Sequence, residues 1–118
     1  IEPYVTEGLR TFERQAELYA KGRTKTGQIV TNAKPGKSLH GFGFSVDCYL
    51  CTNGKPNFNF NPADKAWQRV VTLALASGLK WGGHWKNFKD NPHFQDGDAG
   101  SLKELRAQYP NGWQPPLE

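Results

Sequence analysis

Between Phe44 and Leu50 the chain alternates between apolar and polar side chains. Because successive side chains of a strand point to opposite faces of a sheet, this alternation predicts a strand with one buried and one polar face. The apolar set is Phe44, Val46, Cys48 and Leu50, and the polar set is Ser45, Asp47 and Tyr49. A fold built on such a strand needs a second layer to cover the apolar face.

Helix signals occur in three other segments. Thr11 is a suitable cap for a helix over residues 12–21, and Gly22 is a natural stop. Asn61 and Pro62 are typical of the cap and first position of a helix, here expected over residues 62–77. Ser101 and Glu104 have the spacing of a capping box, which predicts a final helix.

Two of these helices carry an apolar side. In the first, this side is expected to hold Phe12, Ala16, Leu18 and Tyr19. The second is expected to bury Trp67, Val70, Val71, Leu73, Ala74 and Leu75.

Further strands are expected over residues 5–10 and 79–82, and Asn53-Gly54 predicts a tight turn with a short return strand through Phe58 and Phe60. Strands and helices are interspersed without the regular alternation of a parallel sheet, so the pattern predicts an α+β fold. The chain of 118 residues has room for one modest core. We expect one domain over residues 1–108 and an extended tail over residues 109–118.

No apolar run approaches the roughly 18–20 residues of a membrane span, so no membrane insertion is expected. No signal peptide is visible, although the chain begins at Ile1 and contains no Met, which suggests trimming or a fragment. The net charge of +4 favours anionic partners such as nucleic acid, acidic lipid or cell-wall polymer. Since the basic residues are scattered except for Lys21, Arg23 and Lys25, we expect no nucleic-acid binding.

Cys48 and Cys51 lack the second pair that a zinc knuckle needs. A redox pair stays open, but two small apolar residues beside a turn suffice, and they do not indicate an oxidising compartment.

The chain has three histidines, at positions 40, 84 and 93. His40 closes a glycine-containing loop, and Asp47 lies on the polar face of the strand that follows. Pro92 disfavours a helix through its neighbours, so we expect His93 to enter a strand next to Asp47, with Asp90 on the loop before it.

Two imidazoles and one carboxylate suit a catalytic zinc ion, since three protein ligands leave the fourth position open to water. Asp90 is a candidate to carry the water's proton to the leaving amine, and Arg10 is a candidate to stabilise the oxyanion. From the residues alone, a surface or structural role for each histidine stays open.

Three segments together resemble the zinc D,D-carboxypeptidases and L-alanyl-D-glutamate endopeptidases. The stretch from Ser38 to Asp47 is similar to their Ser-x-His-x-x-Gly-x-Ala-x-Asp signature, with Ser45 in place of the usual Ala. Asp90-Asn91-Pro92-His93 matches their acidic residue three positions before the last zinc-binding His. Residues 7–15 resemble their Arg-containing strand-to-helix segment.

The resemblance implies one Zn²⁺ per chain, held by His40, Asp47 and His93, with Asp90 as general base and acid. It further implies that Arg10 polarises the scissile carbonyl, that Ser38 contacts substrate and that Gln15 fixes the loop around Arg10. The implied fold is the small α+β fold shared with the hedgehog signalling domain, with about three helices and an antiparallel sheet that carries the metal.

The chain departs from the family at position 84, where His replaces the usual Asp before Trp85. A fourth ligand there would close the site to water, so we expect His84 and Trp85 to line the substrate cleft, or His84 simply to be exposed. The family's usual N-terminal helix is also absent, which fits a trimmed chain.

Compact members without a signal peptide are typically phage endolysins. The resemblance therefore implies a monomer that is made in the host bacterial cytoplasm and cuts the L-Ala–D-Glu bond of wall peptidoglycan. A D,D-carboxypeptidase that releases terminal D-Ala stays open, with Lys34 and Lys37 as carboxylate contacts. A non-catalytic hedgehog-like zinc module is a third alternative.

Overall fold

The structure, a computed structural model, describes residues 2–87 and 89–114 and divides the chain into two compact units. The first unit comprises residues 1–8 and 45–99, and the second comprises residues 9–44 and 100–118. Residues 109–114 of the expected tail belong to the second unit, where the Trp113 backbone N–H donates a hydrogen bond to the Gly41 carbonyl (3.0 Å). The domain boundary at residue 108 stays a prediction.

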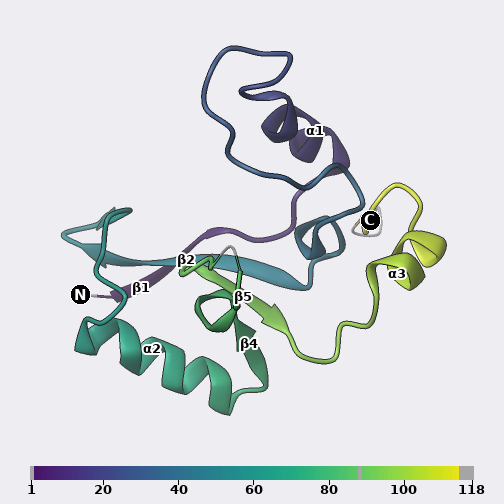
Figure 1. The fold of residues 1–118 in the computed structure, drawn as a ribbon. Helices are drawn as coiled ribbons and strands as arrows, with labels where there is room; N and C mark the ends of the chain where they lie inside the picture. Colours follow the sequence, from purple (N-terminus) through teal and green to yellow (C-terminus); the bar gives the residue numbers. More distant parts are fainter. Residues whose placement is uncertain (1, 88, 115–118) are drawn as a thin grey trace. The chain divides into compact units, whose positions relative to one another are not determined.

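An antiparallel sheet of five strands forms the first unit, in the order β1-β2-β5-β4 with β3 paired to β2 (Figure 1). The strands are β1 (Glu2–Glu7), β2 (Ser45–Thr52), β3 (Lys55–Pro56), β4 (Leu79–Trp81) and β5 (His93–Asp96). Asn53 and Gly54 both have positive φ, as the expected tight turn between β2 and β3 requires. The predicted α+β class with a small antiparallel sheet is confirmed.

Helix α2 (Lys65–Ala76) covers one face of this sheet and completes the core (Figure 1). The buried members of this core are Cys48, Leu50, Trp67, Val71, Trp81 and Phe94. The predicted alternation is confirmed at the centre of β2, since Cys48 and Leu50 are buried in the core while Tyr49 between them is not. It fails at the start, where Phe44 lies before the strand and Ser45 of the expected polar set is buried. The opposite face of the sheet is thereby left for polar side chains.

The two cysteines form no disulfide. Cys48 is buried in the core, and this burial raises the pKa of its thiol. Its place in the core agrees with a packing role for the pair.

Helix α1 (Phe12–Ala20), the 3-10 turn η1 (Leu39–Phe42) and helix α3 (Leu102–Gln108) belong to the second unit. Two of the three predicted caps are confirmed: Thr11 Oγ1 accepts from the Arg14 N–H (3.0 Å), and Ser101 Oγ accepts from the Glu104 N–H (3.1 Å). Within the described ranges, no helix has the length and apolar character needed to cross a membrane.

Several expected element boundaries are wrong, and those of α2 and β1 differ most. Helix α2 begins three residues later than predicted because Asn61 and Pro62 form a separate turn, in which Asn61 Oδ1 accepts from the Ala63 N–H. Asp64 is the actual cap, with Oδ1 accepting from the Ala66 N–H (2.9 Å). Strand β1 ends at Glu7, so Arg10 lies beyond the strand and in the second unit.

The expected return strand is also shorter than predicted. It covers only Lys55–Pro56, and one more backbone hydrogen bond to β2 follows it, from the Asn57 N–H to the Leu50 carbonyl (2.8 Å). The rings of Phe58 and Phe60 pack edge-on against Tyr49, with centroids 4.8 and 5.9 Å away.

Burial on the helices differs from the expectation at several positions. Leu73 and Leu75 of α2 are 60% and 39% exposed, because α2 presents only one side to the sheet. On α1 the buried residue is Gln15, at 1% exposure, while Ala16 is exposed. A polar side chain at the centre of the second unit needs hydrogen-bond partners, which are described with the site.

The contrast between Trp67 and Leu73 on one helix gives a test of this packing. Trp67→Ala removes a fully buried side chain and should lower the free energy of unfolding by about 3–5 kcal/mol. Leu73→Ala, on the exposed side, should change it by less than about 0.5 kcal/mol. Urea unfolding of both variants measures the difference, and equal losses would contradict the assigned orientation of α2.

Candidate active site

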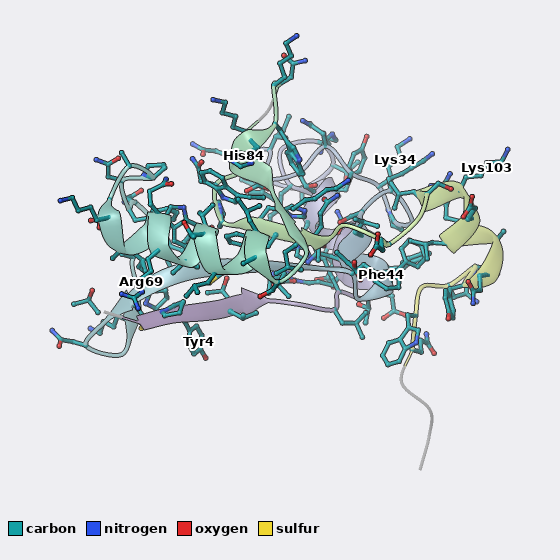
Figure 2. The ribbon with its side chains drawn as sticks, turned by 90° about the horizontal axis from the view of Figure 1, so that it is seen from below. Tyr4, Lys34, Phe44, Arg69, His84 and Lys103 are labelled. Carbon is teal, nitrogen blue, oxygen red and sulfur yellow. The ribbon has the colours of Figure 1, made fainter. Side chains whose placement is uncertain are left out.

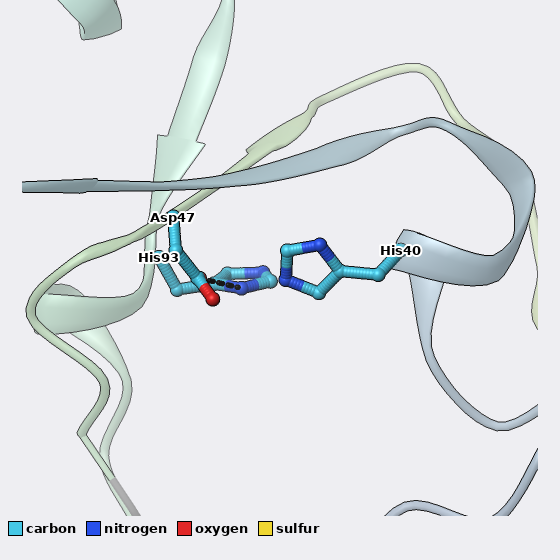
Figure 3. Close-up of side chains that lie close together, drawn as sticks. All are labelled: His40, Asp47 and His93. Carbon is cyan, nitrogen blue, oxygen red and sulfur yellow. Dashed lines mark ion pairs between the residues drawn. The ribbon is translucent and has the colours of Figure 1, made fainter. Parts of the chain in front are cut away.

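Asp47 and His93 are directly opposite one another in the antiparallel pair of β2 and β5. Their side chains therefore share a face of the sheet, and it is the face away from α2, because the neighbouring Val46–Phe94 pair faces the core. The Asp47 Oδ1 and His93 Nδ1 atoms are 3.6 Å apart (Figure 3). The expectation that His93 enters a strand beside Asp47 is confirmed.

The two ring nitrogens of His93 have different neighbours: Nδ1 lies next to Asp47, and Nε2 lies next to Gln95. Gln95 lies two residues after His93, hence on the same face of β5, and its Oε1 is 2.9 Å from His93 Nε2. The tautomer with a proton on Nε2 donates to this oxygen and leaves Nδ1 as an acceptor in the neutral ring.

This arrangement passes a simple test for a zinc site. Two ligand atoms bound at about 2.0–2.2 Å to a tetrahedral zinc ion lie roughly 3.3–3.6 Å apart. The 3.6 Å between Nδ1 and Oδ1 fits that span. A metal-ligating histidine also commonly donates its other N–H to an oxygen acceptor, the position that Gln95 has here.

The surroundings of the His93 imidazole favour its protonated form. Burial by itself lowers the pKa of His93, but hydrogen bonds to Asp47 and Gln95 and the charges of Asp90 and Asp47 outweigh it, so the pKa is raised above 6.5. The pairing thus stabilises the metal-free fold below pH 6.5, and this contribution is lost as the pH rises through the folded-state pKa.

Asp90 lies on a loop whose backbone is fixed at several points. The Asp90 N–H donates to the Gly82 carbonyl (3.1 Å), and the Asp90 carbonyl accepts from the His93 N–H (3.2 Å). Trp81 Nε1 donates to the Asn91 carbonyl (2.7 Å). A Cβ at Gly82 would lie 2.3 Å from the Asp90 carbonyl oxygen, so this close approach requires glycine.

Tyr49 is a member of this face that we did not single out from the sequence. Burial raises the pKa of Tyr49, and the charges of Asp47 and Asp90 raise it further, so its hydroxyl lies in the field of both carboxylates. Tyr49 and Gln95 each follow a candidate ligand by two residues. That period-two spacing was the signal that could have identified them.

In the second unit, His40 lies in η1 and is 4% exposed. Its backbone N–H donates to Ser38 Oγ (3.2 Å), and its carbonyl accepts from the Arg10 N–H (2.8 Å). The second unit therefore brings Ser38, His40 and Arg10 together, and Ser38 caps the turn that holds His40.

The buried Gln15 connects Arg10 to the long loop. Arg10 Nη1 donates to Gln15 Oε1 (2.9 Å), and Gln15 Nε2 donates to the Ala33 carbonyl (2.7 Å). The expectation that Gln15 fixes the loop around Arg10 is confirmed. Both the oxygen and the nitrogen of the Gln15 amide are therefore hydrogen-bonded, which explains why a polar residue is buried here.

His84 and Trp85 lie in the first unit, on and just after the 3-10 turn η2 (Gly82–His84). His84 is exposed and its ring packs edge-on against Trp81, 4.9 Å between centroids (Figure 2). The Trp85 ring lies 5.0 Å from that of His93. Trp85 thus contacts a candidate ligand directly, while a role of either residue in substrate binding stays a prediction.

Comparison with known proteins places this geometry in context. Residues 31–96 match a protein family described as D-alanyl-D-alanine carboxypeptidase. The chain is 42% identical over 101 residues to the peptidoglycan L-alanyl-D-glutamate endopeptidase CwlK of Bacillus subtilis, covering 80% of this chain and 60% of the relative. It is 30% identical over 95 residues to the L-alanyl-D-glutamate peptidase of Listeria phage A118, covering 80% and 30%.

The fold has a solved counterpart in the L-Ala D-Glu endopeptidase ChiX of Serratia marcescens. The TM-score is 0.56 at 28% identity, over 88% of this chain and 70% of that one. The chain spans three-fifths or less of the length of the Bacillus and Listeria phage relatives.

The proton on His93 can be tested without metal. Asp47→Asn removes a carboxylate that raises the His93 pKa, so the pKa should fall; Asp96→Asn, farther along β5, should change it less. The measurement is an NMR titration of the imidazoles in chelator-treated protein. An unchanged His93 pKa in Asp47→Asn would contradict the pairing.

Proposed function

Because this chain belongs to the D-alanyl-D-alanine carboxypeptidase family, we propose that it is a zinc-dependent peptidoglycan peptidase that hydrolyses the L-Ala–D-Glu bond of the stem peptide. The observation that carries the proposal is the cross-strand Asp47–His93 pair, with Gln95 on the other ring nitrogen. The choice of bond is supported by the names of CwlK, the phage A118 peptidase and ChiX.

In this proposal His40, Asp47 and His93 hold the zinc ion, and each supplies one ligand atom. The local chain supports the inclusion of His40. The Phe44 N–H donates to the Leu39 carbonyl (3.1 Å), which ties the turn containing His40 to the residue directly before β2. Asp47 is the third residue of that strand.

A zinc ion so held would polarise the substrate and make water acidic enough to react near neutral pH. Asp90 is proposed to accept the proton of the attacking water on a carboxylate oxygen and to pass it to the leaving amine. Arg10 is proposed to donate hydrogen bonds to the scissile carbonyl oxygen as negative charge develops there. Gln15 holds the Arg10 guanidinium at Nη1, which limits the freedom of this donor before substrate arrives.

The site of action follows from the substrate. Peptidoglycan is the proposed partner, and we propose that the chain acts on the bacterial wall as a monomer, as phage endolysins do. The phage A118 peptidase supports the phage comparison. The alternative substrate, a terminal D-Ala, is kept because of the description of the matched family.

Digestion of purified peptidoglycan tests the reaction. Mass spectrometry should find new amino-terminal D-Glu on the stem peptides of wild-type digests, and free D-Ala as the only product would overturn the endopeptidase proposal. Asp90→Asn should slow hydrolysis by roughly 10²–10⁴-fold, because general acid–base catalysis contributes about that factor. The control is Asp98→Asn on an exposed turn, which should act at the wild-type rate.

The role of Gln95 gives a prediction that does not depend on activity. Gln95→Leu removes the acceptor for His93 Nε2–H and should weaken zinc affinity by roughly 10–100-fold. Gln95→Glu keeps an oxygen acceptor and should retain the affinity, as should Gln108→Leu on α3. Competition with a chromophoric chelator measures all three, and wild-type affinity in Gln95→Leu would refute the assigned role.

A further inference from the structure

The positive charge of this protein is concentrated in one stretch of sequence. Residues 18–46 contain five Lys or Arg and no Asp or Glu. The rest of the chain holds the other ten basic residues and all eleven acidic ones, so it is close to neutral. This stretch therefore carries +5, more than the net charge of +4, and it belongs mostly to the second unit.

The loop that follows α1 carries these basic residues, and we call them the basic cluster: Lys21, Arg23, Lys25, Lys34 and Lys37. The Ala20 carbonyl accepts from the N–H groups of residues 23, 24 and 25, which folds the chain tightly after α1. Lys21 and Lys25 are joined by a β-bridge. The turn closed by the Lys37 N–H and the Lys34 carbonyl (2.9 Å) holds the other two lysines together.

Arg23 joins the two halves of the basic cluster. Its guanidinium lies 3.8 Å from the centroid of the Tyr19 ring and donates to the carbonyls of Tyr19 and Thr31. Lys34 Nζ lies 5.8 Å from the centroid of the same ring (Figure 2). The loop is thus held in place by Arg23, and all five members of the cluster are exposed.

The nearby acidic residues do not neutralise the basic cluster. Helix α1 carries Glu13 and Glu17, and Glu17 already pairs with Arg14 (3.7 Å) on the same helix. The carboxyl end of α1 also carries partial negative charge, which favours cations beside it but adds no full anion. The result is a set of exposed cationic side chains on a loop that Arg23 holds in place.

We propose that the basic cluster is a docking surface for a phosphate-rich, anionic polymer of the bacterial wall. Closely spaced exposed lysines bind repeated phosphates through charge and without base-edge recognition. The cluster would hold the enzyme on its insoluble substrate, and in this respect the inference rests on the proposed wall peptidase function. Nucleic acid is less suited, because Arg23 and Lys34 lie against Tyr19, the aromatic ring of the cluster on which a base could stack.

A pair of variants with equal net charge tests the location of this surface. Lys21→Gln/Lys25→Gln removes two charges from the basic cluster, and Lys55→Gln/Lys65→Gln removes two exposed charges from the first unit. Both are made in the Asp90→Asn background and sedimented with purified walls over a range of salt concentrations. The cluster variant should bind less, and the slope of log affinity against log salt should become shallower by about 1.4 to 1.8. The Lys55/Lys65 control should keep the parent slope.

Two further probes identify the partner. Walls stripped of phosphodiester polymers by hydrofluoric acid should bind the parent protein as weakly as intact walls bind the cluster variant. Equal losses in both variants, unchanged binding to stripped walls, or tighter binding to duplex DNA than to intact walls would overturn the proposal. Hydrolysis of a soluble stem peptide, with Asp90 restored, separates the two ideas: it should be unchanged in the cluster variant, whereas its absence in the parent would refute the peptidase function.

Discussion

The register between β2 and β5 is the constraint on which the candidate site depends. Val46 and Phe94 are opposite one another toward α2, so the next pair along, Asp47 and His93, must face the other way. A slip of one residue would turn the apolar pair to solvent and the ionisable pair into the core. Exposing a buried side chain such as Phe94 costs roughly 1.5–3 kcal/mol, so packing of the core holds the chemistry in place.

The loop before β5, which has no regular secondary structure, brings Asp90, the proposed proton carrier, close to Asp47 and His93 on this face. Three hydrogen bonds fix its backbone. The Asp90 N–H donates to the Gly82 carbonyl, and Trp81 Nε1 donates to the Asn91 carbonyl. The Cys48 N–H donates to the Pro92 carbonyl (2.8 Å). A carboxylate on an unsupported loop would sample many positions, and each restraint removes some of that freedom. The backbone of the loop is thus held against the neighbouring strands of the sheet.

In the second unit, the buried amide of Gln15 restrains Arg10 and the long loop. Gln15 at 1% exposure bridges Arg10 and Ala33, and Arg10 in turn bonds to the carbonyl of His40. The polar residues proposed for catalysis are therefore also the ones that organise this unit locally. The basic cluster lies farther along the same loop and uses Arg23 as its internal support, which leaves the lysines exposed.

The sequence by itself determined the period-two alternation of β2, the caps at Thr11 and Ser101, and the candidate ligands His40, Asp47 and His93. These depend on local preferences or on short motifs, which are readable along the chain. Other features needed the tertiary structure: Asp64 rather than Asn61 as a cap, the exposure of Leu73, and the short β3. Tyr49 and Gln95 were also identified only there: their period-two spacing from Asp47 and His93 puts them on the same face, but the spacing alone does not say that this face carries a site. Their role comes from the strand register, which long-range burial decides and no single segment encodes.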